Sequence, residues 1–120
     1  MWDWSLCENP SARFENMVAS HLLKHCHARE DSQGDRVELR FVRDSQGRQL
    51  DFVVIENDKP VFAVECKTGE QKLSRNVCYF AERTDIPRFY QVHMGTRDYE
   101  VAQYHARVLP LATLARLLTL

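Results

Sequence analysis

The spacing of apolar and polar residues divides the chain into one long helical segment followed by shorter strands. Over residues 10–27 apolar residues recur every three or four positions, as in a helix with one buried face. Asn9 or Ser11 can cap this helix, and Pro10 suits its first turn. The predicted buried stripe contains Phe14, Met17, Val18, Ala19 and Leu22. Glu15 lies at the edge of this stripe, so its carboxylate is predicted to point along the side that packs on a sheet.

Three segments with the two-residue period of strands follow a polar loop at 28–35. They span residues 36–43, 48–55 and 61–67. In the first, Val37, Leu39 and Phe41 are expected to face inward, with Glu38 and Arg40 facing outward. The turn-forming stretches 44–47 and 56–60 separate the strands, and Gly47 is predicted to adopt a positive φ. The sequence therefore predicts a three-stranded antiparallel unit.

The turn at 56–60 decides how the second and third strands pair. If the loop consists of the three residues 57–59, Glu56 pairs with Pro60, Val53 with Ala63, and Asp51 with Glu65. Directly opposed residues share a face of the sheet. A two-residue loop would instead place Asp51 and Glu65 on opposite faces, because a slip of one residue reverses every side chain.

The second half of the chain predicts a helix, a strand and a final helix. A helix is expected over residues 70–83 with Leu73, Val77 and Phe80 buried, and a strand over 88–94 that ends at Gly95. Residues 99–108 are ambiguous between helix and strand. A short helix begins at Pro110, and its inward residues are Leu111, Leu114, Ala115 and Leu118. The predicted fold is α/β, with the element order αβββαβ and a further helix.

Composition indicates one intracellular domain over residues 1–120. A chain of 120 residues has room for one core, and 44% hydrophobic with 28% charged residues is ordinary for a globular protein. No apolar stretch is long enough to cross a bilayer, and no signal peptide is present. The four cysteines lack metal-site spacing, which indicates reduced thiols in a cytoplasmic protein. The net charge of −1 means that any contact with nucleic acid must come from a local patch.

Asp51, Glu65 and Lys67 are charged residues within otherwise apolar strands. Such residues are rarely buried unless they are paired or bind a metal. A divalent cation between Asp51 and Glu65 would turn their repulsion into attraction, because hard cations bind carboxylate oxygens. The structural alternative is a solvated hairpin face on which Glu65 pairs with Lys67, or Asp51 with Arg40.

An aspartate followed by Glu-x-Lys on the next strand resembles the PD-(D/E)xK nuclease motif. The chain also resembles the C-terminal domain of unknown function of many bacterial and archaeal AAA-type ATPases. This similarity extends over nearly the whole chain, most clearly over residues 2–67. It rests on Trp2–Ser5, Arg13–Asn16, Ala19, His21–Lys24, Leu39–Asp44, Gly47–Arg48, Asp51–Val54 and Glu65–Lys67. Gln49 replaces a common glutamate of these domains, and Leu50 replaces the proline of the motif name. The ATPase part is missing, because no phosphate-binding loop of the Gly-x-x-x-x-Gly-Lys type occurs.

This resemblance implies a restriction-endonuclease-like αβββαβ core with a mixed central sheet flanked by helices, and a Mg²⁺ or Mn²⁺ site. Asp51, Glu65, the Cys66 backbone carbonyl and Glu15 would be the metal ligands. Asp51, Glu65 and Lys67 would be catalytic in phosphodiester hydrolysis, and Gln71 or Lys72 could assist. The alternative for Glu15 is an exposed side chain that pairs with Arg48.

Basic residues near these positions form a candidate DNA-binding rim, since backbone phosphates dominate DNA affinity. They are Arg40, Arg43, Arg48, Lys72 and Arg75. Scattered arginines in a chain with 17 acidic residues also fit an ordinary solvated surface. The competing functions are a catalytically silent module that binds DNA or protein beside an AAA-type ATPase, and a homodimerisation domain. Metal dependence would separate the enzyme from both.

Overall fold

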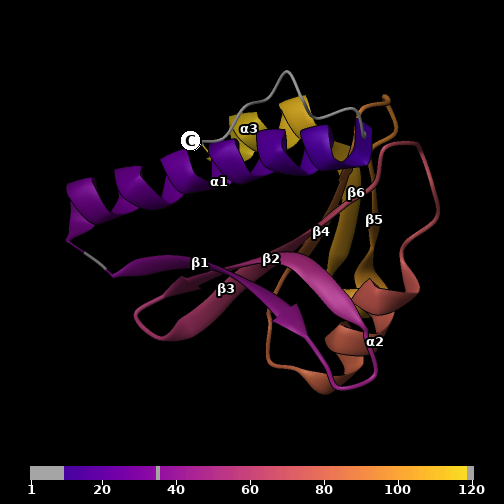
Figure 1. Cartoon of the computed structure of the whole chain (residues 1–120), viewed down its shortest axis with the longest axis horizontal. Coiled ribbons are helices and arrows are strands. Elements are labelled where there is room, and N and C mark those ends of the chain that lie inside the picture. Colours follow the sequence, from indigo (N-terminus) through magenta and orange to yellow (C-terminus); the bar gives the residue numbers. More distant parts are fainter. Residues whose placement is uncertain (1–9, 35, 119–120) are drawn as a thin grey trace.

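The computed structural model describes residues 10–34 and 36–118 (Figure 1). Its centre is a six-stranded mixed sheet with the strand order β1-β2-β3-β4-β6-β5. The strands are β1 (Val37–Arg43), β2 (Gln49–Glu56), β3 (Lys59–Cys66), β4 (Phe89–His93), β5 (Tyr99–Val101) and β6 (Ala106–Pro110). The β1-β2-β3 unit is antiparallel, β3-β4 and β4-β6 are parallel, and β5 is antiparallel to β6. The ambiguous segment 99–108 is therefore two strands around a short 3₁₀ turn.

Helices cover both faces of this sheet. Figure 1 shows α1 (Pro10–Gln33) and α3 (Leu111–Leu118) together on one face, and α2 (Arg75–Arg83) on the other. Strand residues alternate between the two layers: Val54 and Val64 belong to the α1 layer, while Val53 and Ala63 belong to the α2 layer. The predicted α/β class with a mixed sheet flanked by helices is confirmed.

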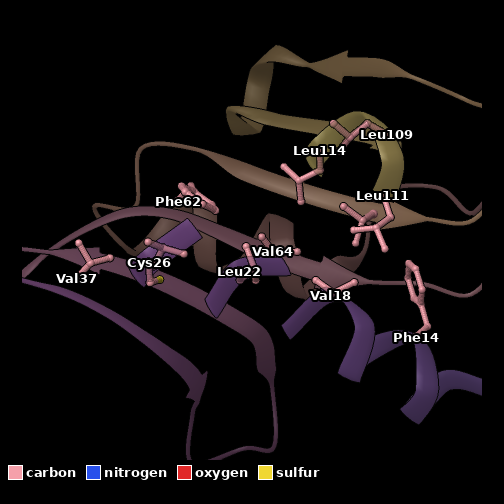
Figure 2. Close-up of a cluster of buried hydrophobic side chains, with 12 residues drawn as sticks. Phe14, Val18, Leu22, Cys26, Val37, Phe62, Val64, Leu109, Leu111 and Leu114 are labelled. Atoms are coloured by element: carbon pink, nitrogen blue, oxygen red, sulfur yellow. The ribbon is translucent and has the colours of Figure 1, made fainter. Parts of the chain in front are cut away.

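The α1 layer is built on a single file of helix residues. Figure 2 shows Phe14, Val18, Leu22 and Cys26 facing side chains of the sheet and of α3. Met17 was predicted to be buried but is 45% exposed. Four residues turn an α-helix by about 400°, which is about 40° more than a full turn. The stripe of residues spaced four apart therefore winds around the helix, away from the side on which Met17 lies.

The first helix is longer than predicted, because it continues to Gln33 rather than ending at residue 27. The Arg29 guanidinium forms an ion pair with Glu56 at 2.6 Å and fixes the added turns to β2. Gly34 has a φ of +71° and donates its backbone N–H to the Glu30 carbonyl, as a helix-terminating glycine does. The last turns of this helix contain mostly polar residues, so the spacing of apolar residues could not predict them.

The second helix is shorter than predicted, because α2 begins at Arg75 rather than at residue 70. The buried Gln91 side chain on β4 captures the preceding segment. It accepts a hydrogen bond from the Ser74 backbone N–H (2.7 Å) and donates to the carbonyls of Gln71 (3.4 Å) and Lys72 (3.0 Å). These backbone groups therefore bond to the Gln91 side chain instead of forming the hydrogen bonds of a helix. Val77 and Phe80 are buried as expected, and Leu73 packs against their cluster from outside the helix.

The β2–β3 turn has two residues, not the predicted three. Asn57 and Asp58 both have positive φ (51° and 68°), and Glu56 pairs with Lys59 and Ile55 with Pro60. The register then shifts by one residue, so that Val54 pairs with Phe62 and Val53 with Ala63. Val61 is the extra residue of a β-bulge. The predicted Glu56–Pro60 pair is wrong, but the Val53–Ala63 pair is confirmed because the bulge adds the residue that the turn lacks.

Strand β1 differs from the prediction at Phe41. Its ring was expected to face inward but is 71% exposed. The β1–β2 register shifts between Arg40 and Val42, but the extra residue lies on β2, because two β2 residues separate the partners of these two positions. Faces still alternate along β1: Val37 and Leu39 belong to the α1 layer, and Val42 packs against the α2 layer. Phe41 therefore lies on the α1 side of this edge strand, where it lines a cavity.

Candidate functional site

The β2–β3 register brings Asp51 and Glu65 together. Phe52 pairs with Val64, so the next position along β2 lies beside the next position along β3. One oxygen of Asp51 (Oδ2) accepts a hydrogen bond from the backbone N–H of Cys66 at 2.8 Å. The Glu65 carboxyl shares a further hydrogen bond with Asp51. The two acidic residues predicted to be neighbours are therefore in direct contact.

Glu65 is the buried member of the pair, with 4% of its surface exposed. Burial is the main reason that its pKa rises to about 8, and the hydrogen bond to Asp51 and the charge of Asp51 raise it further. The charge of Lys67 and the Ser74 hydroxyl, which donates to Glu65 Oε2 at 3.2 Å, lower it in part. Because Glu65 is buried, the alternative of a solvated hairpin face is wrong.

Glu15 approaches the same place from α1. Partial burial of the carboxyl, followed by the charge of Asp51, raises the pKa of Glu15. The Cys66 thiol has its pKa raised by burial and then by the charges of Asp51, Glu15 and Glu65. All three carboxylates therefore act on one point at the end of β3, although Glu15 itself remains exposed.

Glu15 lines two cavities. One, of about 230 Å³, is lined by Phe14, Glu15, Cys66, Lys67, Thr68 and Gln71. The other, of about 360 Å³, includes Glu15, Asp51, Phe41 and Arg43 in its lining. The half-buried Lys67 is held by its backbone N–H, which donates to the Val92 carbonyl at 2.9 Å. Carboxylates and an ammonium group thus border spaces that are open to a small ligand.

Ser74 and Gln91 support the site but were not predicted to belong to it. Ser74 caps α2 by accepting from the Asn76 backbone N–H (3.1 Å), while its hydroxyl donates to Glu65. Gln91 is the β4 partner of Glu65 in the parallel register and holds the backbone of Ser74. A glutamine within the apolar strand 89–93 is a signal that sequence reasoning could have used, because a buried amide needs specific partners.

The five basic residues predicted to form a rim are placed unequally. Arg43 lines the larger cavity together with Asp51. Arg40 pairs with Glu38 at 2.8 Å, and Arg48 pairs with Asp44 at 3.2 Å and stacks on the Tyr79 ring at 4.2 Å. The predicted alternatives that paired Arg40 with Asp51 and Arg48 with Glu15 thus give way to other partners. Lys72 lies before α2 rather than on its first turns, and the exposed Arg75 begins that helix.

The donor chemistry fits a hard divalent cation in part. Two touching carboxylates, one of them buried, provide the oxygen ligands that Mg²⁺ prefers. Across residues 10–34 and 36–118, no group of three or more His, Cys, Asp or Glu side chains is arranged to hold a metal. Asp51 and Glu65 would therefore need oxygens from elsewhere, and the Cys66 carbonyl, Glu15 and water are the available sources.

Comparison with known proteins identifies the family. Residues 11–114 match the model of a domain of unknown function, DUF4143. This match covers most of the chain, so the chain belongs to the DUF4143 family. No match was found among curated proteins or among solved structures. Within the part of the chain that the structure describes, no helix has the length and apolar character needed to span a bilayer.

Proposed function

We propose that this chain is a metal-dependent phosphodiester hydrolase with the restriction-endonuclease-like fold of PD-(D/E)xK nucleases. The contact between Asp51 and the buried Glu65, two residues before Lys67, is the observation that carries this proposal. The element order α1-β1-β2-β3-α2-β4 supports it, because it follows the αβββαβ order of that fold.

Each residue of the site has a distinct proposed role. Asp51, Glu65 and the Cys66 carbonyl would hold Mg²⁺ or Mn²⁺, and Glu15 would complete the ligand set directly or through water. The bound metal would lower the pKa of a water molecule and stabilise charge on the scissile phosphate. Lys67 would orient that water or stabilise the phosphate oxygens through its ammonium group, with Gln71 or Lys72 assisting.

The surroundings of the site agree with these roles. The Ser74 hydroxyl orients one oxygen of Glu65, and the Cys66 N–H orients one oxygen of Asp51. Gln49, which stands where related domains commonly have a glutamate, accepts a hydrogen bond from Arg43 at 3.1 Å. It thereby holds a cation beside the larger cavity, where a phosphate would approach.

DNA is the substrate class we propose, with an AAA-type ATPase module and a second copy of the chain as further partners. Cys26, Cys66 and Cys78 are free thiols, which supports a reducing, cytoplasmic setting.

Calorimetric titration with Mn²⁺ tests the metal site. Wild-type protein should bind Mn²⁺, and Asp51→Asn should abolish binding while preserving shape. Asp58→Asn is the matched control, because Asp58 is an exposed carboxylate in the turn of the same hairpin. Equal binding by wild type and Asp51→Asn would contradict the proposal. Cleavage of labelled DNA by wild type with Mn²⁺, lost in Asp51→Asn and in Lys67→Met, would complete the test.

A second candidate function is a catalytically silent module that binds DNA or protein. It is favoured by the lack, among the described residues, of a preformed group of three metal-binding side chains. This function predicts salt-dependent DNA affinity without cleavage at any Mn²⁺ concentration. It also predicts that Asp51→Asn binds DNA at least as well as wild type, because a negative charge is removed.

A further inference from the structure

Phe41 is the most exposed of the large apolar side chains in the described part of the chain. Its ring is 71% exposed on β1, which is the outer strand of the sheet. An exposed aromatic ring on an edge strand is an aggregation liability. Phe41 lies on the same face of β1 as Val37 and Leu39, but it is not part of the core cluster that they join.

Phe41 belongs to the same cavity as the carboxylates of the proposed site. The cavity of about 360 Å³ is lined by Phe41 and Arg43 from β1, Asp51 from β2 and Glu15 from α1. Its volume lies within the roughly 300–1,000 Å³ typical of small-molecule sites. An aromatic surface, a cation and the carboxylates of Asp51 and Glu15 thus border one space.

The charges around Phe41 favour an anionic ligand over a second copy of the strand. Arg36, Arg40 and Arg43 lie on or beside β1, and exposed basic residues at a sheet edge discourage pairing with another edge. Arg36 and Arg40 share Glu38, whereas the acceptor of Arg43 is the neutral amide of Gln49. Arg43 therefore keeps its full charge for a phosphate.

We propose that Phe41 is a stacking platform for an unpaired nucleobase, with Arg43 binding the adjacent phosphate. Single-stranded nucleic acid is then the substrate class, and this inference rests on the proposed function. Bases within a duplex are stacked on each other, so only an unpaired base can place its face on a side chain. Stacking on Phe41 would position the neighbouring phosphodiester beside Asp51, which lines the same cavity.

Fluorescence anisotropy with a fluorescein-labelled oligothymidine, in EDTA to prevent hydrolysis, tests this proposal. Phe41→Ala should raise the Kd roughly 5- to 100-fold, the effect of removing one stacked base, and Phe41→Trp should restore wild-type affinity. An oligonucleotide whose bases are replaced by abasic sites should bind wild type and Phe41→Ala equally, as should a blunt-ended duplex of two separate strands. Leu23→Ala, which removes an exposed apolar side chain from α1, is the matched control and should change nothing.

Three results would overturn the proposal, and they differ in what else they overturn. Equal oligothymidine binding by wild type and Phe41→Ala rejects the stacking role and leaves the proposed function standing. Absence of binding to single-stranded and duplex DNA or RNA by wild type rejects the proposed function as well. A dimer in light scattering that becomes a monomer in Phe41→Ala, with unchanged DNA affinity, assigns the ring to contact between copies.

Discussion

At the residue scale, the main feature is a pair of acidic side chains held in contact inside the fold. Two carboxylates in contact repel each other when both are ionised, and the burial of Glu65 adds a desolvation cost. The Cys66 N–H and the Ser74 hydroxyl stabilise the pair, and the charge of Lys67 favours the ionised form of Glu65. The folded chain therefore holds a proton on this pair near neutral pH that a metal ion would displace.

This arrangement predicts a stability that depends on pH. The pKa of Glu65 rises from 4.5 in the unfolded chain to about 8 in the folded chain, so the folded state binds the extra proton between these values. Its contribution to stability is therefore highest below about pH 4.5, declines as pH rises, and levels off above about pH 8. Between pH 5 and 8 we expect the wild type to lose roughly 2–4 kcal/mol more of its unfolding free energy than Glu65→Gln does. Urea unfolding at several pH values measures the difference.

A parallel pH dependence in wild type and Glu65→Gln would contradict the assignment of this proton. Adding Mn²⁺ at pH 8 provides an independent check. It should stabilise wild type and leave Glu65→Gln unaffected, because a ligand stabilises only the state that binds it.

At the element scale, the β2–β3 hairpin controls which face carries the carboxylates. A two-residue turn alone would place Asp51 and Glu65 on opposite faces, and the bulge at Val61 reverses that outcome. Asn57 is held beside the start of β1, because its side-chain oxygen accepts a hydrogen bond from the Arg36 backbone N–H at 3.2 Å. The turn and the bulge thus act together to set the register of the site.

The turn geometry predicts how substitutions at Asp58 affect stability. Its φ of +68° suits glycine better than any residue with a Cβ. Asp58→Gly should be as stable as wild type or slightly more stable, and Asp58→Ala should be about 1 kcal/mol less stable than Asp58→Gly. Chemical denaturation compares the three proteins. Equal stability of the alanine and glycine variants would mean that the turn does not adopt this conformation in solution.

At the scale of the whole molecule, the sheet lies between two core layers. Helices α1 and α3 pack on one face of the sheet, and α2 packs on the other (Figure 1). The α1 layer joins the beginning of the chain to its end, since Phe14, Val18 and Leu22 share a cluster with Leu111 and Leu114 (Figure 2). Glu15 extends from the same helix, so packing of this layer also positions the third carboxylate.

Neighbouring leucines of α1 allow a matched test of this layer. Leu22 is fully buried, and Leu23 is 45% exposed. Leu22→Ala should lower the unfolding free energy by about 3–5 kcal/mol, because it leaves a cavity between helix and sheet. Leu23→Ala should change it by less than about 0.5 kcal/mol. Similar losses in both variants, measured by urea unfolding, would indicate that α1 packs in another orientation.

The sequence by itself determined the local character of most elements. Alternation identified the three strands of the antiparallel unit, helical spacing identified Phe14, Val18 and Leu22, and the two acidic residues were recognised because charges rarely interrupt buried strands. These features depend on residues close together in the chain, because the spacing of apolar residues directly reflects which side chains are buried.

The tertiary structure decided the features that depend on distant residues. The Gln91 amide sets the start of α2 at Arg75, and Glu56 holds the last turns of α1 through Arg29. The bulge at Val61 brings Asp51 to Glu65. Phe41 is exposed because its edge strand borders a cavity on the α1 side at this position. The physical reason is that a hydrogen bond across the fold contributes roughly 0.5–1.5 kcal/mol, which is enough to offset local propensities that differ by less than about 1 kcal/mol per residue.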